Sequence, residues 1–273
     1  MAVLTIILAT VEFVVVVAFA LAAVILRAID GRGFLASTVV GFVIICSGGI
    51  SWFVIVAVFF TLGVAFTLYK YGYKRRLGSA QEKGGTRSWP NILANGGVAS
   101  VIALLSFTRP TVNLSVLFLG AISTSAADTV ATELGLLSHE KPRLITNLAM
   151  TVTPGTSGGV SWLGILGAVF ASFIIGSMAF FLGLMPTRID IVPICVTSGV
   201  LGATFDSVLG ATVQRKGHCL ICNKPTEAPR HCGESTQVRA GVRYVDNNLV
   251  NLMATVVGAA ASFAVFLVLM LLG

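Results

Sequence analysis

Two acidic residues lie inside hydrophobic stretches of this sequence, far apart along the chain. Asp128 belongs to STSAADTVATELG and Asp206 to ATFDSVLGATVQRKG. A carboxylate at the centre of a bilayer costs about 2.5–3.5 kcal/mol, so each residue needs a partner or a function. Because Mg²⁺ at phosphate-transfer sites takes one or two carboxylates plus substrate phosphates, the pair is a candidate metal and catalytic site. The alternative is that both acids are hydrogen-bonded inside a helix bundle.

Two further acids are candidate Mg²⁺ ligands. Glu133 follows Asp128 by five residues, which separates them by about 140° around a helix. We therefore expect Asp128 to point inward and Glu133 to lie at the membrane surface. Asp246 precedes NNLVNLMAT and is predicted to cap the helix that begins there.

Asparagines occur at two predicted helix starts. WPNILANGG places Asn91 and Asn95 four residues apart, and DNNLVNLMAT places Asn247 and Asn251 at the same spacing. Residues four apart share one helix face. Since buried amides need hydrogen-bond partners, these side chains either join helices or bind a polar ligand. In the second case Asn95, Asn247 and Asn251 bind phosphate or a metal-bound water.

The stretch PGTSGG, residues 154–159, precedes a hydrophobic run. Glycines let a backbone approach an anion closely, and successive amides before a helix form an anion-binding nest. The sequence has no Walker A ending, so a close-packing turn is the alternative. The predicted phosphate cradle comprises Gly155, Thr156, Ser157, Gly158 and Gly159, and the candidate charge neutralisers are Lys83, Arg87 and Arg215.

A cysteine and histidine cluster occurs in HCLICNKPTEAPRHCG, within a loop at about 213–247. Three thiols and two imidazoles within so few residues are typical of a structural Zn²⁺ site. The adjacency of His231 and Cys232 is awkward for a tetrahedral ion, so reduced thiols or a CxxC disulfide are alternatives. The candidate ligands are Cys219, Cys222, His231 and Cys232.

The composition indicates what positions these residues. The chain has 273 residues, of which 56% are hydrophobic and 11% charged, and its mean hydropathy is +0.93. This is typical of an all-α polytopic membrane bundle, and we expect a single membrane domain over 1–273. The predicted spans are 2–26, 33–46, 50–69, 92–107, 111–131, 159–184, 189–212 and 248–272. If Ser47–Gly49 is a kink rather than an outer turn, the count is seven.

The net charge of +7 follows the membrane topology. With eight spans, all 18 basic residues except Arg109 and Arg188 fall in the turn at 27–32 and the loops at 70–91, 132–158 and 213–247. Cytoplasmic loops collect Lys and Arg, so we expect these loops, and the active face, in the cytoplasm. The basic charge therefore needs no nucleic-acid partner.

Six motifs taken in order resemble a known membrane family. They are NILANGGVAS, ADTVATELG, PGTSGGVSWLG, DSVLGATVQ, CxxC followed by HCG, and DNNLVNL. Together they resemble the family that includes the plant chloroplast phytyl-phosphate kinase of tocopherol synthesis, with archaeal, bacterial and animal relatives. The resemblance implies phosphate transfer from a nucleoside triphosphate, CTP or another, to a membrane-bound isoprenoid monophosphate such as phytyl or geranylgeranyl phosphate. It gives the partners as a nucleotide and a membrane lipid.

Two other functions stay open. Intramembrane acids and a glycine-interrupted span are also common in secondary transporters, although no internal repeat is evident. A lipid-alcohol kinase or a cytidylyltransferase would use a similar site with a different acceptor. The sequence leaves open the prenyl length, the nucleoside base and the oligomeric state.

Overall fold

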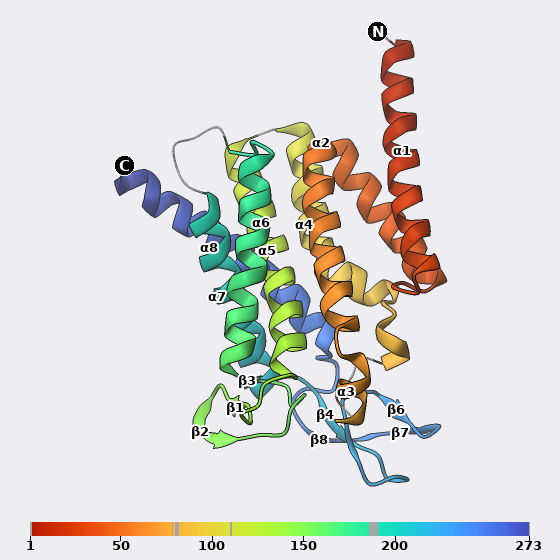
Figure 1. Ribbon diagram of the computed structural model, residues 1–273, viewed down its shortest axis with the longest axis vertical. Helices are drawn as coiled ribbons and strands as arrows, with labels where there is room; N and C mark the ends of the chain where they lie inside the picture. The colour runs from red at the N-terminus through yellow and green to blue at the C-terminus, as the bar shows by residue number, and fades with distance from the viewer. Residues whose placement is uncertain (1, 78, 80–81, 110, 186–190, 273) are drawn as a thin grey trace.

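The computed structural model describes all residues except 1, 78, 80–81, 110, 186–190 and 273. The described chain is mainly helical, as predicted (Figure 1). Its helices are α1 (Ala2–Ile25), α2 (Gly31–Leu68), α3 (Tyr71–Arg76), the 3₁₀ turn η1 (Glu82–Gly85), α4 (Trp89–Thr108), α5 (Val112–Gly135), α6 (Trp162–Phe181), α7 (Ile191–Thr212) and α8 (Asn247–Leu272).

Seven helices in the described chain are long and apolar enough to cross a membrane, and α2 is the longest of them. Its 38 residues would extend about 57 Å, nearly twice the thickness of a bilayer core. The helix instead reverses at Gly49, whose φ is 77° and ψ is −179°. A Cβ at Gly41 would lie 3.2 Å from the Phe53 ring, so the two arms of α2 pack against each other and run in opposite directions (Figure 1). The predicted turn at Ser47–Gly49 is therefore confirmed.

Short strands occupy the two long loops that precede α6 and α8. The sequence pattern does not predict these strands. Figure 1 shows these strands and α3 at one end of the bundle, here called the loop face, while α1 begins and α8 ends toward the other end. The strands are β1 (Arg143–Leu144), β2 (Asn147–Thr151), β3 (Gly159–Val160), β4 (Lys216–His218), β5 (Pro225–Thr226), β6 (Arg230–His231), β7 (Glu234–Ser235) and β8 (Gln237–Ala240). They pair as the sheets β2-β1-β3, β5-β4-β8 and β6-β7.

The central helix is α5, which packs against α2, α4, α6, α7 and α8. Small residues allow this close approach, as is usual where membrane helices pack without a hydrophobic driving force. A Cβ added at Gly202 of α7 or Gly258 of α8 would overlap Thr124 of α5. Helices α7 and α8 therefore converge on α5, and the ends of the three helices at the loop face are held close together.

The connections predicted to share the loop side lie together. Arg87 donates its backbone N–H to the Ala28 carbonyl at 2.9 Å, and Asp30 donates to the Arg87 carbonyl at 3.1 Å. These bonds join the turn after α1 to the segment before α4. Of the two basic residues outside the predicted inner loops, Arg188 lies outside the described residues.

Candidate functional site

The two intramembrane acids predicted to form the site lie near each other. Asp128 is half-buried on α5 and Asp206 is 9% exposed on α7, and the two helices pack together. A Cβ at Gly202 of α7 would overlap Thr124 of α5, and Asp206 and Asp128 each lie four residues further along these helices, toward the loop face. Two carboxylates in a poorly solvated site repel each other unless a cation or a proton lies between them.

An asparagine from α8 completes this pair. The Asn251 amide donates to Asp206 Oδ2 at 3.1 Å and to the Asn247 carbonyl at 2.8 Å. Asn251 is buried, whereas the Asn247 side chain is exposed, so Asn247 contributes through its backbone. Asp246 accepts a hydrogen bond from the Leu249 N–H at 2.9 Å, which confirms the predicted helix cap. Asp246 is exposed and its carboxylate caps α8, whereas Asp206 is buried.

The glycine loop, residues 154–159, reaches the same end of α7. Ser157 donates its hydroxyl to Glu227 Oε1. The Gln214 amide donates to Glu227 Oε2 at 2.6 Å and to Ser157 Oγ at 3.2 Å. We call these residues the polar cluster: Asp128, Asp206, Asn251, Ser157, Gln214 and Glu227.

Gly158 seats the glycine loop on α7. Its φ is 83°, and a Cβ there would lie 2.6 Å from the Ala211 backbone nitrogen. Some hydrogen-bond donors of the predicted phosphate cradle are already bonded to carbonyls within the turn. Thr156 donates its N–H to the Thr153 carbonyl at 3.1 Å, and Gly159 donates to the Thr156 carbonyl at 2.9 Å. The Thr156 hydroxyl also donates to the Thr153 carbonyl, at 2.8 Å.

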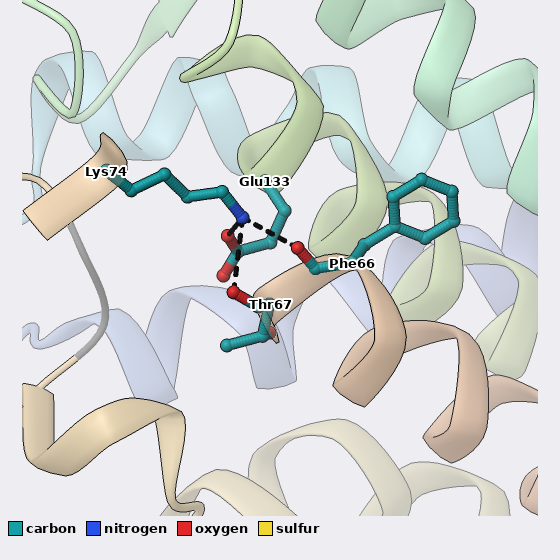
Figure 2. A network of polar contacts seen from close by, with 4 residues as sticks. All are labelled: Phe66, Thr67, Lys74 and Glu133. Carbon is teal, nitrogen blue, oxygen red and sulfur yellow. Dashed lines mark hydrogen bonds and ion pairs between the residues drawn. The ribbon is translucent and has the colours of Figure 1, made fainter. Parts of the chain in front are cut away.

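Glu133 forms a buried ion pair instead of lying at the membrane surface. Its Oε2 is 2.6 Å from Lys74 Nζ, and the side chains are 2% and 1% exposed. Lys74 also donates to the carbonyls of Phe66 and Thr67, at 2.6 and 3.2 Å (Figure 2). The expectation of a surface position is wrong, because α3 folds back and brings Lys74 under the last turn of α2. A cation is favourable at this helix end.

Arg87 lies between aromatic rings of α2. Its guanidinium is 5.8 Å from the centre of the Phe59 ring and 5.3 Å from that of Phe60. Burial lowers the pKa of Arg87 to about 10, while the charge of Glu133 acts in the opposite direction. The side chain therefore remains cationic at neutral pH.

A cavity of about 60 Å³ adjoins Arg87 between α1, α2 and α4. Its lining is apolar except for Ser37, Arg87, Asn91 and Asn95. Asn95 donates its amide to the Asn91 carbonyl at 2.9 Å. Its backbone carbonyl also accepts a hydrogen bond from the hydroxyl of Ser125 on α5, at 2.9 Å. Asn95 thus lies at this cavity, on α4, and joins that helix to α5.

Two further predicted charge neutralisers are placed differently. Arg215 is 4% exposed, and it donates to the Glu227 carbonyl at 2.8 Å and to Thr236 Oγ1 at 2.5 Å. Its guanidinium is therefore occupied within the loop between α7 and α8. The side chain of Lys83 lies outside the described part of the molecule.

The predicted Zn²⁺ ligands gather at one point of the same loop. Within the described chain, they form the one group of three or more His, Cys, Asp or Glu side chains close enough to share an ion. Their ligand atoms all lie within 4.8 Å of one another, and they belong to Cys219, Cys222, His231 and Cys232. The neighbouring His218 is outside this group, and its buried Nδ1 has no hydrogen-bond partner among the described residues.

Sequence reasoning missed Glu227 and Lys74. Glu227 lies between the two halves of the cysteine motif, and its position in the predicted zinc loop was the available signal. Lys74 is one of several basic residues in its loop, and nothing in the sequence distinguishes the one that folds inward.

The fold and the polar cluster define a polytopic helical membrane protein with acids and amides gathered near one end of its bundle. Residues 14–259 match the family described as "Integral membrane protein DUF92", and the chain belongs to that family. This membership confirms the membrane-family resemblance drawn from the motifs.

Three relatives illustrate the range of the family. Protein PGR of Arabidopsis thaliana is 31% identical over 245 residues, which cover 76% of this chain and 84% of that protein. An uncharacterized membrane protein of Methanocaldococcus jannaschii is 28% identical over 243 residues, 88% of this chain and 87% of that protein. Protein VTE6, chloroplastic, of Arabidopsis thaliana is 29% identical over 194 residues, 69% of this chain and 57% of that protein. No solved structure matches.

Proposed function

We propose that this protein transfers a phosphate from a nucleoside triphosphate to an isoprenoid monophosphate in the membrane, giving the diphosphate. The observation that carries the proposal is the position of Asp128 on α5 and Asp206 on α7, two helices that pack together at the end of α7 on which the glycine loop lies. Carboxylates suit Mg²⁺, and backbone amides suit phosphate oxygens. Phosphoryl transfer needs this combination, because its catalysis is mostly positioning and neutralisation of charge.

The residue roles follow from their contacts. Asp128 and Asp206 would hold Mg²⁺, which would neutralise charge on the phosphates. Asn251 orients Asp206 through the amide hydrogen bond. Ser157 and the amides of the glycine loop that are not used inside the turn would contact the donor phosphates. Glu227 and Gln214 fix Ser157 in place.

The acceptor needs an anion site beside hydrocarbon. Arg87 supplies a buried cation next to an apolar cavity, with Asn91 and Asn95 in the same wall. We propose that the acceptor phosphate lies at Arg87 and that its tail begins in this cavity. The acceptor oxygen attacks the γ-phosphorus, the bond from that phosphorus to the β–γ bridging oxygen breaks, and the nucleoside diphosphate leaves. No general base is required, because the acceptor phosphate is already anionic.

The family supports the acceptor class. The motifs resemble those of the phytyl-phosphate kinase family, and the chain is similar to protein VTE6 over 194 residues. We further propose that the loop face is cytoplasmic, since its loops hold most of the Lys and Arg residues.

Product analysis tests this function. Purified protein with Mg²⁺, a γ-labelled nucleoside triphosphate and phytyl, geranylgeranyl or farnesyl phosphate should yield labelled lipid diphosphate. Asp206→Asn should abolish the product. A nucleotide attached to the lipid would instead indicate a cytidylyltransferase, and phosphorylation of the free alcohol a lipid-alcohol kinase. Flux across proteoliposomes without any labelled product would indicate a transporter and would refute the proposal.

A further inference from the structure

The loop between α7 and α8 brings three thiols and one imidazole to one point. His231 Nδ1 is 3.4 Å from Cys222 Sγ and 3.3 Å from Cys232 Sγ. All four ligand atoms lie within 4.8 Å of one another. In a tetrahedral site with Zn–S bonds of about 2.3 Å and Zn–N bonds of about 2.0 Å, neighbouring ligand atoms are about 3.5–3.8 Å apart. The cluster therefore has dimensions that fit one tetrahedral ion.

Two tight turns explain how the ligands converge. In the first turn, the Cys219 N–H donates to the Lys224 carbonyl at 2.9 Å, and Asn223 donates back to the Cys219 carbonyl at 3.0 Å. Asn223 has a φ of 57°, which closes this turn. The turn brings Cys219 and Cys222 to one side of the loop.

The second turn joins β6 to β7. His231 pairs with Glu234 across it, and the two residues between them, Cys232 and Gly233, have φ values of 52° and 84°. Two consecutive positive φ values are typical of a type I′ hairpin turn. This sharp reversal lets the adjacent His231 and Cys232 face the same point. Two neighbouring residues can therefore bind the same tetrahedral ion here.

The metal cluster and the polar cluster share one loop. Glu227 lies between Cys222 and His231 in the sequence, and its carboxylate accepts hydrogen bonds from Ser157 and Gln214. Its backbone carbonyl accepts a hydrogen bond from the Arg215 guanidinium at 2.8 Å. Closing the ends of a loop removes much of its conformational freedom. An ion bound at both ends of the segment 222–231 would therefore restrict the position of Glu227.

We infer that Cys219, Cys222, His231 and Cys232 bind one Zn²⁺ ion, and that this ion positions Glu227 against the glycine loop. Arg215 and the metal would both hold the segment, and the hydrogen bond from Ser157 to Glu227 would then fix the position of Ser157. The zinc site stands independently of the proposed phosphate transfer. Its effect on that reaction rests on the proposed function.

Metal analysis of the full-length protein tests the site. The wild type should contain about one zinc per chain. Cys222→Ser and Cys232→Ser should lose this metal, whereas Cys46→Ser, which changes a cysteine of α2 outside the cluster, should retain it. After chelation, added Co²⁺ should give the visible absorption of a tetrahedral cobalt thiolate in the wild type. A wild type that contains no zinc and gives no such cobalt spectrum would overturn the assignment, and so would a wild type that contains iron instead. Both outcomes are measured on the wild type, so they hold even where a variant fails to fold.

Hydrogen exchange tests the positioning role without any assay of phosphate transfer. Removing zinc from the wild type with a chelator should increase amide exchange at 155–159 as well as at 222–231. In Glu227→Ala the exchange at 155–159 should already be fast, and chelation should not change it further. If chelation loosens 222–231 alone in the wild type, the metal is structural only and the positioning role is refuted.

Discussion

The ammonium of Lys74 lies 2.6 Å from the carboxylate of Glu133, and neither side chain is more than 2% exposed. The pair ties α3, which follows the second arm of α2, to the central helix α5 (Figure 2). Removing one partner of a buried pair leaves a charge without compensation, which is more costly than replacing both.

Lys74→Met should therefore destabilise the protein by about 3–5 kcal/mol. Thermal unfolding in detergent micelles measures this loss. The double variant Lys74→Met/Glu133→Leu should be markedly more stable than Lys74→Met alone, and Lys141→Met, at an exposed loop lysine, should unfold as the wild type does. A double variant as unstable as the single one would contradict the ion-pair account.

Gly158→Ala should displace the glycine loop while leaving the bundle folded. The added Cβ would meet the Ala211 backbone at 2.6 Å, and the φ of 83° strains any residue other than glycine. Because small misplacements of catalytic groups are costly, the transfer rate should fall at least ~10-fold. The comparison is Gly72→Ala in α3, where a Cβ would meet nothing within 4 Å. Equal rates for the two variants would show that the loop does not need its close contact with α7.

Arg87→Gln should weaken binding of the lipid phosphate. Its buried cation adjoins the apolar cavity, and a hydrogen bond to a charged group is worth about 1.5–3 kcal/mol. The KM for the isoprenoid monophosphate should therefore rise about tenfold or more, with little change in the KM for the nucleotide. Arg76→Gln, at an exposed arginine of α3, should leave both constants unchanged. A selective rise in the nucleotide KM would assign Arg87 to the donor instead.

Gly49→Ala should destabilise the reversal of α2. The φ of 77° and ψ of −179° belong to a region that is almost exclusive to glycine, and a Cβ there would meet no atom within 4 Å. The cost should therefore come from backbone strain alone, at about 1–3 kcal/mol. Thermal unfolding beside Gly72→Ala measures it. An unchanged unfolding temperature would argue that α2 tolerates a different geometry at its turn.

The spans could be predicted because hydropathy and length report membrane crossing directly. The turn at Ser47–Gly49 was visible from its glycines and from the charge distribution. Asp128 and Asp206 were predictable for a related reason, since a carboxylate in an apolar helix is too costly to be incidental. Asn251 followed from its spacing along one face of α8.

The contacts that depend on loop folding could not be predicted. Glu227 reaches Ser157 because strands β4 to β8 fold the loop back on the end of α7, and no local pattern encodes that path. Glu133 was expected at the surface, because the sequence does not reveal that Lys74 returns beneath α2. Arg215 was a candidate for contact with phosphate, yet its guanidinium is occupied by Glu227 and Thr236.

Bound Mn²⁺, measured by electron paramagnetic resonance as a substitute for Mg²⁺, tests the central claim most directly. With a nucleoside triphosphate present, the wild type should bind about one Mn²⁺ per chain at the polar cluster. Asp128→Asn and Asp206→Asn should each lose this ion, whereas Glu140→Gln, at an exposed acid of the loop face, should retain it. Mn²⁺ binding that persists unchanged in both aspartate variants would contradict the account.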